Sequence, residues 1–176
     1  MEAFATSDIG MARQINEDSY YISKPDDEIK LFIVADGMGG YNGGEVASNL
    51  AVQAAHNYIL SNFEKAKESK ELLLDLAKNS MQYANKIVDE KALRDEDFKS
   101  MGTPLDICLI YGNKAYISHI GDSRIYRIRK EFMRKLTKDH SYVQQLVDEG
   151  KITKEESMNH PKKNMLIKAL GCTEYI

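Results

Sequence analysis

Two long amphipathic helical patterns, placed between two groups of short apolar segments, constrain the fold of this chain more than any other feature. Over 45–63 and from 70 to about 94, apolar residues recur at helical spacing along one side, and charged residues occupy the other. Helices of this kind cover one face of a sheet. The order of strands, two long helices, strands and short helices therefore predicts an α+β fold of antiparallel sheets with helices packed outside them.

Short strand patterns lie on both sides of the helical pair. The expected strands before it are 3–6, 19–23 and 30–35. Those after it are 105–111, 114–120, 124–129 and 132–136. The continuous apolar run of 30–35 predicts a strand buried on both faces. The short connections of the later group predict an antiparallel meander, and capping-box patterns at Ser141 and Thr153 then predict two short helices.

Size and charge exclude several classes of protein. A chain of 176 residues is long enough for one domain with a real core. Its net charge of -3 argues against a general nucleic-acid binder. Neither a signal peptide nor an apolar run of about 20 residues is found, so we expect a cytoplasmic protein without a membrane partner. His56 and His119 match no metal-ligand spacing and are interpreted as structural residues.

A basic stretch at 124–138 runs against the acidic balance of the chain. Its cationic residues include Arg127, Arg129, Lys130, Arg134 and Lys135. The simpler interpretation is the solvated face of a hairpin, which we favour. The functional alternative is a docking surface for an acidic or phosphorylated partner.

Three acidic clusters are placed where strands can end in turns. They are Asn16-Glu17-Asp18, Asp36-Gly37-Met38-Gly39-Gly40 and Gly121-Asp122-Ser123-Arg124. Hard cations such as Mg²⁺ and Mn²⁺ prefer oxygen ligands from carboxylates, carbonyls and waters. With Arg13 as a bidentate phosphate ligand, the clusters indicate metal-assisted phosphoryl chemistry. The competing interpretation is that Asp-Gly forms ordinary turns and that Arg13 pairs with Asp8 or Glu17 at the surface.

These clusters belong to a longer series of motifs. In order, the series is Asp8-x-Gly10-x-x-Arg13-x-x-Asn16-Glu17-Asp18, the Asp36 to Gly40 cluster, Met101-Gly102-Thr103 and Gly121-Asp122-Ser123-Arg124. Several motifs in a fixed order are a strong signal, although each alone is weak. From about 8 to 171, the chain resembles the metal-dependent protein phosphatases of type 2C, the PPM family, and its bacterial branch in particular.

The resemblance implies a fold and a site. The fold is a four-layer α-β-β-α sandwich of two antiparallel sheets, here one domain over 1–176 that is incomplete at its C-terminus, with a small helical flap at about 139–165. The implied metal ligands are Asp18, Asp36, the Gly37 carbonyl and Asp122. Asp36 would bridge two Mn²⁺ or Mg²⁺ ions, and Asp122 would serve a weaker third ion. Arg13 would bind the substrate phosphate, and Glu17 would hold metal-bound waters.

The resemblance also has departures. The chain carries Gly40-Tyr41 and Thr103-Pro104 where bacterial relatives usually have Gly-His and Thr-Thr, which puts fine positioning in question. It ends at Ile176, before the segments that supply two further aspartate ligands in the family. The missing strands would leave sheet edges uncovered, and these edges predict self-association.

Two hypotheses follow from the resemblance. The first is a metal-dependent serine/threonine phosphatase in which a metal-bridging water attacks phosphoproteins, including a cognate serine/threonine kinase. The second is a phosphatase-like module that binds a phosphoprotein with little or no turnover, because the late aspartates are absent.

Overall fold

The structure is a computed structural model that describes residues 1–11, 13–39 and 43–172. Its elements, in chain order, are β1 (Asp18–Ile22), β2 (Lys30–Asp36), α1 (Gly43–Ala66), α2 (Lys70–Arg94), the 3₁₀ helix η1 (Glu96–Phe98), β3 (Leu105–Tyr111), β4 (Lys114–Ile120), β5 (Tyr126–Arg129), β6 (Phe132–Lys135), α3 (Tyr142–Asp148) and α4 (Lys154–Met158). The expected bounds of α2, β3 and β4 are those of the structure. Tyr41, named above as a departure from the family pattern, lies outside the described residues.

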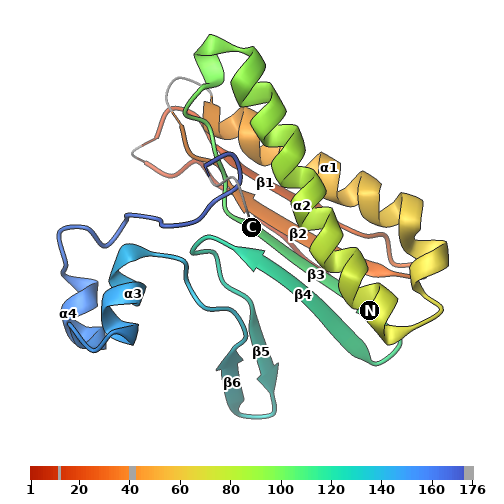
Figure 1. Cartoon of the computed structure of the whole chain (residues 1–176). Coiled ribbons are helices and arrows are strands. Elements are labelled where there is room, and N and C mark those ends of the chain that lie inside the picture. The colour runs from red at the N-terminus through yellow and green to blue at the C-terminus, as the bar shows by residue number, and fades with distance from the viewer. Residues whose placement is uncertain (12, 40–42, 173–176) are drawn as a thin grey trace.

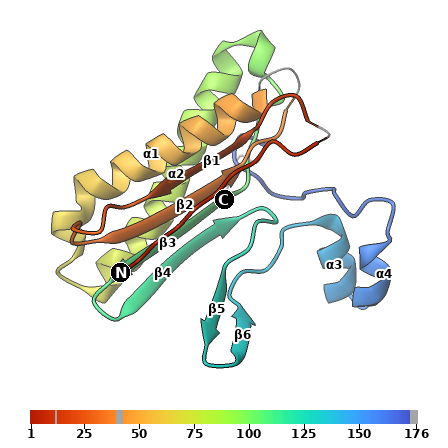
Figure 2. The ribbon, with the colours of Figure 1, turned by 180° about the vertical axis from the view of Figure 1, so that it is seen from behind.

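In the described part of the chain, two antiparallel sheets and four α-helices make up this α+β fold, as the sequence predicts. The larger sheet has the order β1-β2-β3-β4, and β5 pairs with β6 in a separate two-stranded sheet. The long helices α1 and α2 lie side by side across one face of the larger sheet (Figures 1 and 2). In the described part of the chain, no helix is both long and apolar enough to cross a membrane.

The core fills the space between the helical pair and this sheet. From the sheet, β2 contributes Leu31, Ile33 and Ala35, and β3 contributes Leu105, Ile107 and Leu109. On α1 the buried positions are mostly small, including Ala47, Ser48, Ala51, Ala54 and Ala55. Small side chains let a helix approach its neighbours closely, which explains how α1 packs on both α2 and β1.

Alternation along β2 corrects one expectation. Leu31, Ile33 and Ala35 are buried, whereas Val34 between them is 49% exposed. The prediction that this strand is buried on both faces is therefore wrong, because helices cover one face only. The segment 3–6 is also not a strand, since no strand of the described chain pairs with it.

The expected meander of four later strands is wrong at the step from β4 to β5. The β3–β4 and β5–β6 pairs form as predicted, but β4 and β5 do not pair. The chain turns away at Gly121, whose φ is +105°, a value that L side chains rarely adopt. Gly121 also lies directly against Pro104, where a Cβ atom would come within 2.4 Å of the proline ring. The hairpin consequently leaves the plane of the larger sheet (Figure 1).

A buried polar network ties the chain after the hairpin back to the sheet. The His119 Nδ1 atom lies 2.5 Å from a carboxylate oxygen of Asp106, and its Nε2 lies 2.9 Å from the Lys138 carbonyl. Both ring nitrogens thus face oxygen atoms, an arrangement that favours the protonated ring, because this form donates from both nitrogens. The neighbouring ring of His140 stacks on His119 and accepts the Gly121 N–H. This network holds the start of the segment that carries α3 and α4.

Burial disfavours the charged form of His119, but the carboxylate of Asp106 and the carbonyl of Lys138 outweigh it, and the pKa of His119 is raised. A pKa raised by folding contributes stability below the unfolded pKa, and this stability is lost as the pH rises through the folded pKa. Asp106 and His119 pair across the strands β3 and β4. The pair therefore stabilises the fold most in mildly acidic solution.

We expect Asp106→Asn to lower the free energy of unfolding by about 2 kcal/mol at pH 6, because a buried charge-assisted bond is lost. The loss should be smaller at pH 9, because the contribution of the charged ring is lost as the pH rises through the folded pKa of His119. Urea unfolding at the two pH values measures this difference. Asp75→Asn, at an exposed position of α2, is the matched control. An equal loss at both pH values would contradict the protonated pair.

Candidate functional site

Asp18 and Asp36 lie opposite each other at the end of the larger sheet. They are direct partners in the antiparallel register of β1 and β2, and directly opposed residues place their side chains on the same face. Asp36 is an exposed residue, but partial burial of its carboxyl group raises its pKa, and the charges of Asp18 and Asp122 raise it further. The structure therefore opposes Asp18 and Asp36 directly, with Asp122 within electrostatic range of Asp36.

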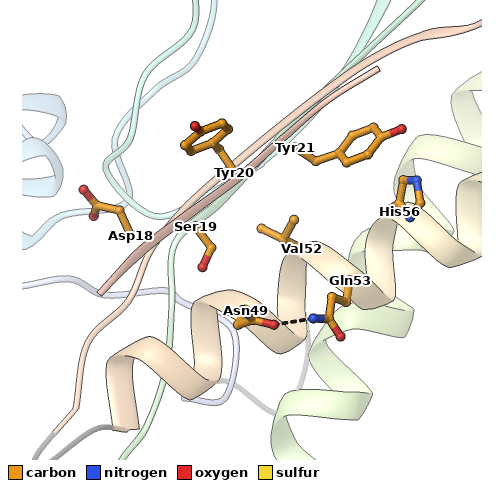
Figure 3. Close-up of a pocket in the computed structure, with 8 residues that line it drawn as sticks. All are labelled: Asp18, Ser19, Tyr20, Tyr21, Asn49, Val52, Gln53 and His56. Carbon is orange, nitrogen blue, oxygen red and sulfur yellow. Dashed lines mark hydrogen bonds between the residues drawn. The ribbon is translucent and has the colours of Figure 1, made fainter. Parts of the chain in front are cut away.

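This face of the sheet is the one that the long helices leave uncovered. Figure 3 shows Asp18 and Tyr20 on the side of β1 away from α1, whereas Ser19 lies toward α1. The Ser19 hydroxyl is 3.0 Å from that of Ser48 on α1. A shallow pocket of about 380 Å³ between β1 and α1 has Asp18 in its wall, but neither Asp36 nor Asp122 lines it. The carboxylate cluster therefore lies on the open face and outside this pocket.

Gly37 turns the chain immediately after Asp36. Its N–H donates to the Glu17 carbonyl at 3.0 Å. A Cβ atom at Gly37 would come within 2.0 Å of the Gly44 carbonyl oxygen and 2.6 Å of the Glu17 carbonyl oxygen. Only glycine fits between these two backbone segments, so the Asp-Gly sequence is a packing requirement here as well as a turn signal. This packing fixes the position of Asp36 relative to Glu17.

Arg13 and Glu17 form an ion pair of 2.7 Å between Nη1 and Oε2. The Arg13 side chain is 69% exposed, whereas that of Glu17 is 17% exposed. This pairing is one of the two alternatives that the sequence left open for Arg13. The charge of Arg13 also opposes the rise in the pKa of Asp36, which places the guanidinium within electrostatic range of the carboxylates. The same residue is therefore available to an anion at the cluster.

Two isolated β-bridges connect segments next to the cluster, and the sequence did not predict them. Met38 and Gly102 exchange backbone hydrogen bonds of 2.8 Å, and Thr103 exchanges bonds of 2.9 and 3.1 Å with Leu170. Pro104, which departs from the family pattern, is buried against Gly121. It therefore packs under the turn that carries Asp122. Motif order brings these segments into one alignment, but their pairing is a property of the tertiary structure.

The donors at the cluster suit a hard divalent cation. Asp18, Asp36 and Asp122 supply carboxylate oxygens. The pKa of Asp36 is raised first by burial of its carboxyl group and then by the charges of Asp18 and Asp122, which a bound cation would offset. Over the described ranges 1–11, 13–39 and 43–172, no three histidine, cysteine, aspartate or glutamate side chains are grouped closely enough to hold a metal ion by themselves. The residues present fit part of a metal site.

Comparison with known proteins identifies relatives along almost the whole chain. A family described as "Protein phosphatase 2C" matches residues 11–173. The serine/threonine phosphatase stp of Listeria innocua is 38% identical over 174 residues, which cover 97% of this chain and 67% of the relative. The chain thus spans about two thirds of the length of this curated relative.

Solved structures agree with this match. The crystal structure of the Mycobacterium tuberculosis serine/threonine phosphatase PstP/Ppp superposes with a TM-score of 0.84 at 35% identity, covering 97% of this chain and 68% of that one. The catalytic domain of PstP in complex with two manganese ions gives a TM-score of 0.77 at 35% identity. The match covers 94% of this chain and 65% of that domain. The second structure contains the kind of ion that the carboxylates here would suit.

Proposed function

The chain belongs to the protein phosphatase 2C family of serine/threonine phosphatases, and we propose that it supplies the metal-binding and phosphate-binding half of a Mn²⁺- or Mg²⁺-dependent site for phosphoserine and phosphothreonine in proteins. The observation that carries the proposal is the direct opposition of Asp18 and Asp36, with Asp122 close enough to act on Asp36. Asp18 and Asp122 both act on Asp36, and carboxylates within this range repel one another unless cations bind.

Each residue has a distinct part in this proposal. Asp18, Asp36 and the Gly37 carbonyl would hold two ions, and Asp122 would hold a weaker third. Bound ions of this kind supply an acidified water and neutralise charge on the phosphoryl group. Arg13 binds the phosphate as a bidentate donor, for which its guanidinium turns from Glu17 toward the anion. Glu17 then remains fixed against the start of α1 and accepts hydrogen bonds from ordered water.

A binding module with little turnover is the second candidate function. It is favoured by the metal-site geometry, because fewer than three metal-binding side chains group together in the part of the chain that the structure describes. A cognate kinase as partner, a flap at about 139–165, self-association through the sheet edges and a cytoplasmic location stay predictions.

The test compares the 176-residue chain with a form extended to the length of the relatives. The extended form should hydrolyse phosphothreonine peptides only with Mn²⁺ or Mg²⁺, and EDTA should abolish the activity. The 176-residue chain should show little turnover even at Mn²⁺ concentrations on the order of 1 mM, because fewer than three metal-binding side chains are grouped in its described residues. Metal-independent hydrolysis by the extended form would refute the proposal. Strong Mn²⁺-dependent hydrolysis by the 176-residue chain would refute the second candidate.

For Arg13→Ala in the extended form, we expect KM for a phosphopeptide to rise about tenfold while kcat changes less, because the arginine binds the phosphate of the ground state. Steady-state kinetics at saturating Mn²⁺ measure both constants. Arg13→Lys keeps the charge but loses the bidentate geometry, so its KM should lie between those of the unsubstituted protein and Arg13→Ala. A fall in kcat at unchanged KM would instead mean that Arg13 stabilises only the transition state.

A further inference from the structure

A cleft of about 810 Å³ lies between the β5–β6 hairpin and the helices α3 and α4. Figures 1 and 2 show these elements together, away from the long helices. Asp122 forms part of the cleft wall, and the charge of Asp122 also acts on Asp36. The cleft therefore adjoins the carboxylate cluster, and its volume is enough for several side chains of a peptide.

The charge of the cleft is opposite to that of the whole chain. Its cationic lining residues are Arg124, Lys135, Lys138, Lys154 and Lys163. Its acidic lining residues are Asp122 and Asp139. Five cations against two carboxylates leave the lining positive, although the chain has a net charge of -3. An anionic ligand would thus be attracted to this cleft in preference to the rest of the surface.

Internal ion pairs hold three of these cations in place. The Asp139 side chain, only 8% exposed, lies 2.6 Å from Arg124 Nη2 and 3.0 Å from Lys135 Nζ. Burial disfavours ionisation of Asp139, but the hydrogen bonds from Arg124 and Lys135 outweigh it and lower its pKa. Lys138 Nζ lies 2.7 Å from Asp148 on α3. These pairs attach the hairpin base to the helical segment and so maintain the cleft.

The remaining two cationic residues of the cleft, Lys154 and Lys163, differ from these three. Among the residues that the structure describes, neither Lys154 nor Lys163 has an ion pair. Lys154 begins α4, and Lys163 lies in the turn that follows this helix. Apolar side chains, including Met133 and Val143, form other parts of the same lining. The cleft therefore offers free positive charge next to apolar contact area.

We propose that this cleft binds the acidic residues that flank a phosphorylated serine or threonine in a protein substrate, with Lys154 and Lys163 as the charge contacts. The inference rests on the proposed function for the position of the phosphorylated residue at the carboxylate cluster. A peptide fits better than a nucleic acid, because Met133 and Val143 suit a segment of mixed acidic and apolar side chains, whereas a continuous phosphate backbone would gain nothing from these apolar contacts. Of the basic stretch at 124–138, only Arg124, Lys135 and Lys138 are among the cations that line this cleft, so the docking surface considered for that stretch is limited to these residues.

Fluorescence anisotropy of labelled phosphoserine peptides on the metal-free 176-residue chain tests this proposal. One peptide carries glutamates beside the phosphoserine, and the matched peptide carries glutamines there. The glutamate peptide should bind about fivefold more tightly, a size expected for two solvent-exposed ion pairs. The double variant Lys154→Gln/Lys163→Gln should remove this preference. The control variant Lys65→Gln/Lys114→Gln, at exposed positions outside the cleft, should retain it.

Failure of the cleft and failure of the proposed function give different results. The glutamate preference should persist in unphosphorylated versions of both peptides, so it is measurable whether or not the protein turns over. Equal affinity for the two peptides, or a preference that survives in the Lys154/Lys163 variant, would overturn the proposal. Equally tight binding of a single-stranded DNA oligonucleotide of matched charge would also overturn it, because the cleft would then select negative charge alone. Circular dichroism confirms that the variants are folded.

Discussion

Replacing Asp36 by asparagine is expected to lower kcat/KM for phosphopeptides by more than about 100-fold in the extended form, because outer-shell changes at metal sites already cost 10–100-fold. Asp36 occupies the central position of the cluster, where the charges of Asp18 and Asp122 both act on it. An asparagine keeps the shape but removes the charge that would serve both ions. Steady-state assays across a Mn²⁺ titration measure the effect.

The same substitution should have the opposite effect on metal-free stability. Folding raises the pKa of Asp36, so the ionised group costs stability as the pH rises above its unfolded pKa. Asp36→Asn should therefore raise the melting temperature of the metal-free 176-residue chain at pH 7 and abolish any further rise on adding Mn²⁺. Asp75→Asn on α2 should change neither quantity. A lower metal-free melting temperature in Asp36→Asn would show that Asp36 stabilises the fold and would contradict destabilisation by the charges of Asp18 and Asp122.

Replacing Gly37 by alanine is expected to destabilise the fold by on the order of 4 kcal/mol, because overpacking against backbone has no inexpensive relief. The new Cβ atom would lie 2.0 Å from the Gly44 carbonyl oxygen and 2.6 Å from that of Glu17. Neither atom can move without shifting the start of α1 or the segment before β1. Urea unfolding of the 176-residue chain measures the loss.

Gly112→Ala provides the matched control for this prediction. Gly112 has a φ of +60° and no heavy atom within 4 Å of the added Cβ. Its substitution should cost only about 1 kcal/mol, the strain of a left-handed alanine. Similar losses at both positions would mean that the contact between Gly37 and the Gly44 carbonyl relaxes at little cost.

Several elements could be predicted from the sequence because their information is local. The bounds of α2, β3 and β4 follow from apolar periodicity and from a Gly-Asn turn, and the structure has them where they were expected. The ordered motifs likewise predicted the family, because motif order needs no coordinates. The opposition of Asp18 and Asp36 is a further consequence of two adjacent antiparallel strands, of which β1 begins at Asp18 and β2 ends at Asp36.

Other features depend on which segments meet in space. The apolar run of 30–35 has the same composition whether one face or both are covered, and only the packing of α1 and α2 shows that Val34 is exposed. The hairpin leaves the sheet at Gly121 because Pro104, far away in the sequence, occupies the space beside it. A periodic pattern contains neither fact.

By itself, the sequence determined most of the helices and strands, the family and the identity of the candidate ligands, since each rests on residue type and spacing along the chain. The tertiary structure alone decided which charges meet. Asp106 lies within an apolar run and acquires its meaning from His119 on the next strand. Asp139 engages Arg124 and Lys135, whereas Lys154 and Lys163 in the same cleft form no ion pair among the residues that the structure describes. Electrostatic interactions act through space over a few ångströms, so their pattern becomes defined only when distant segments pack together.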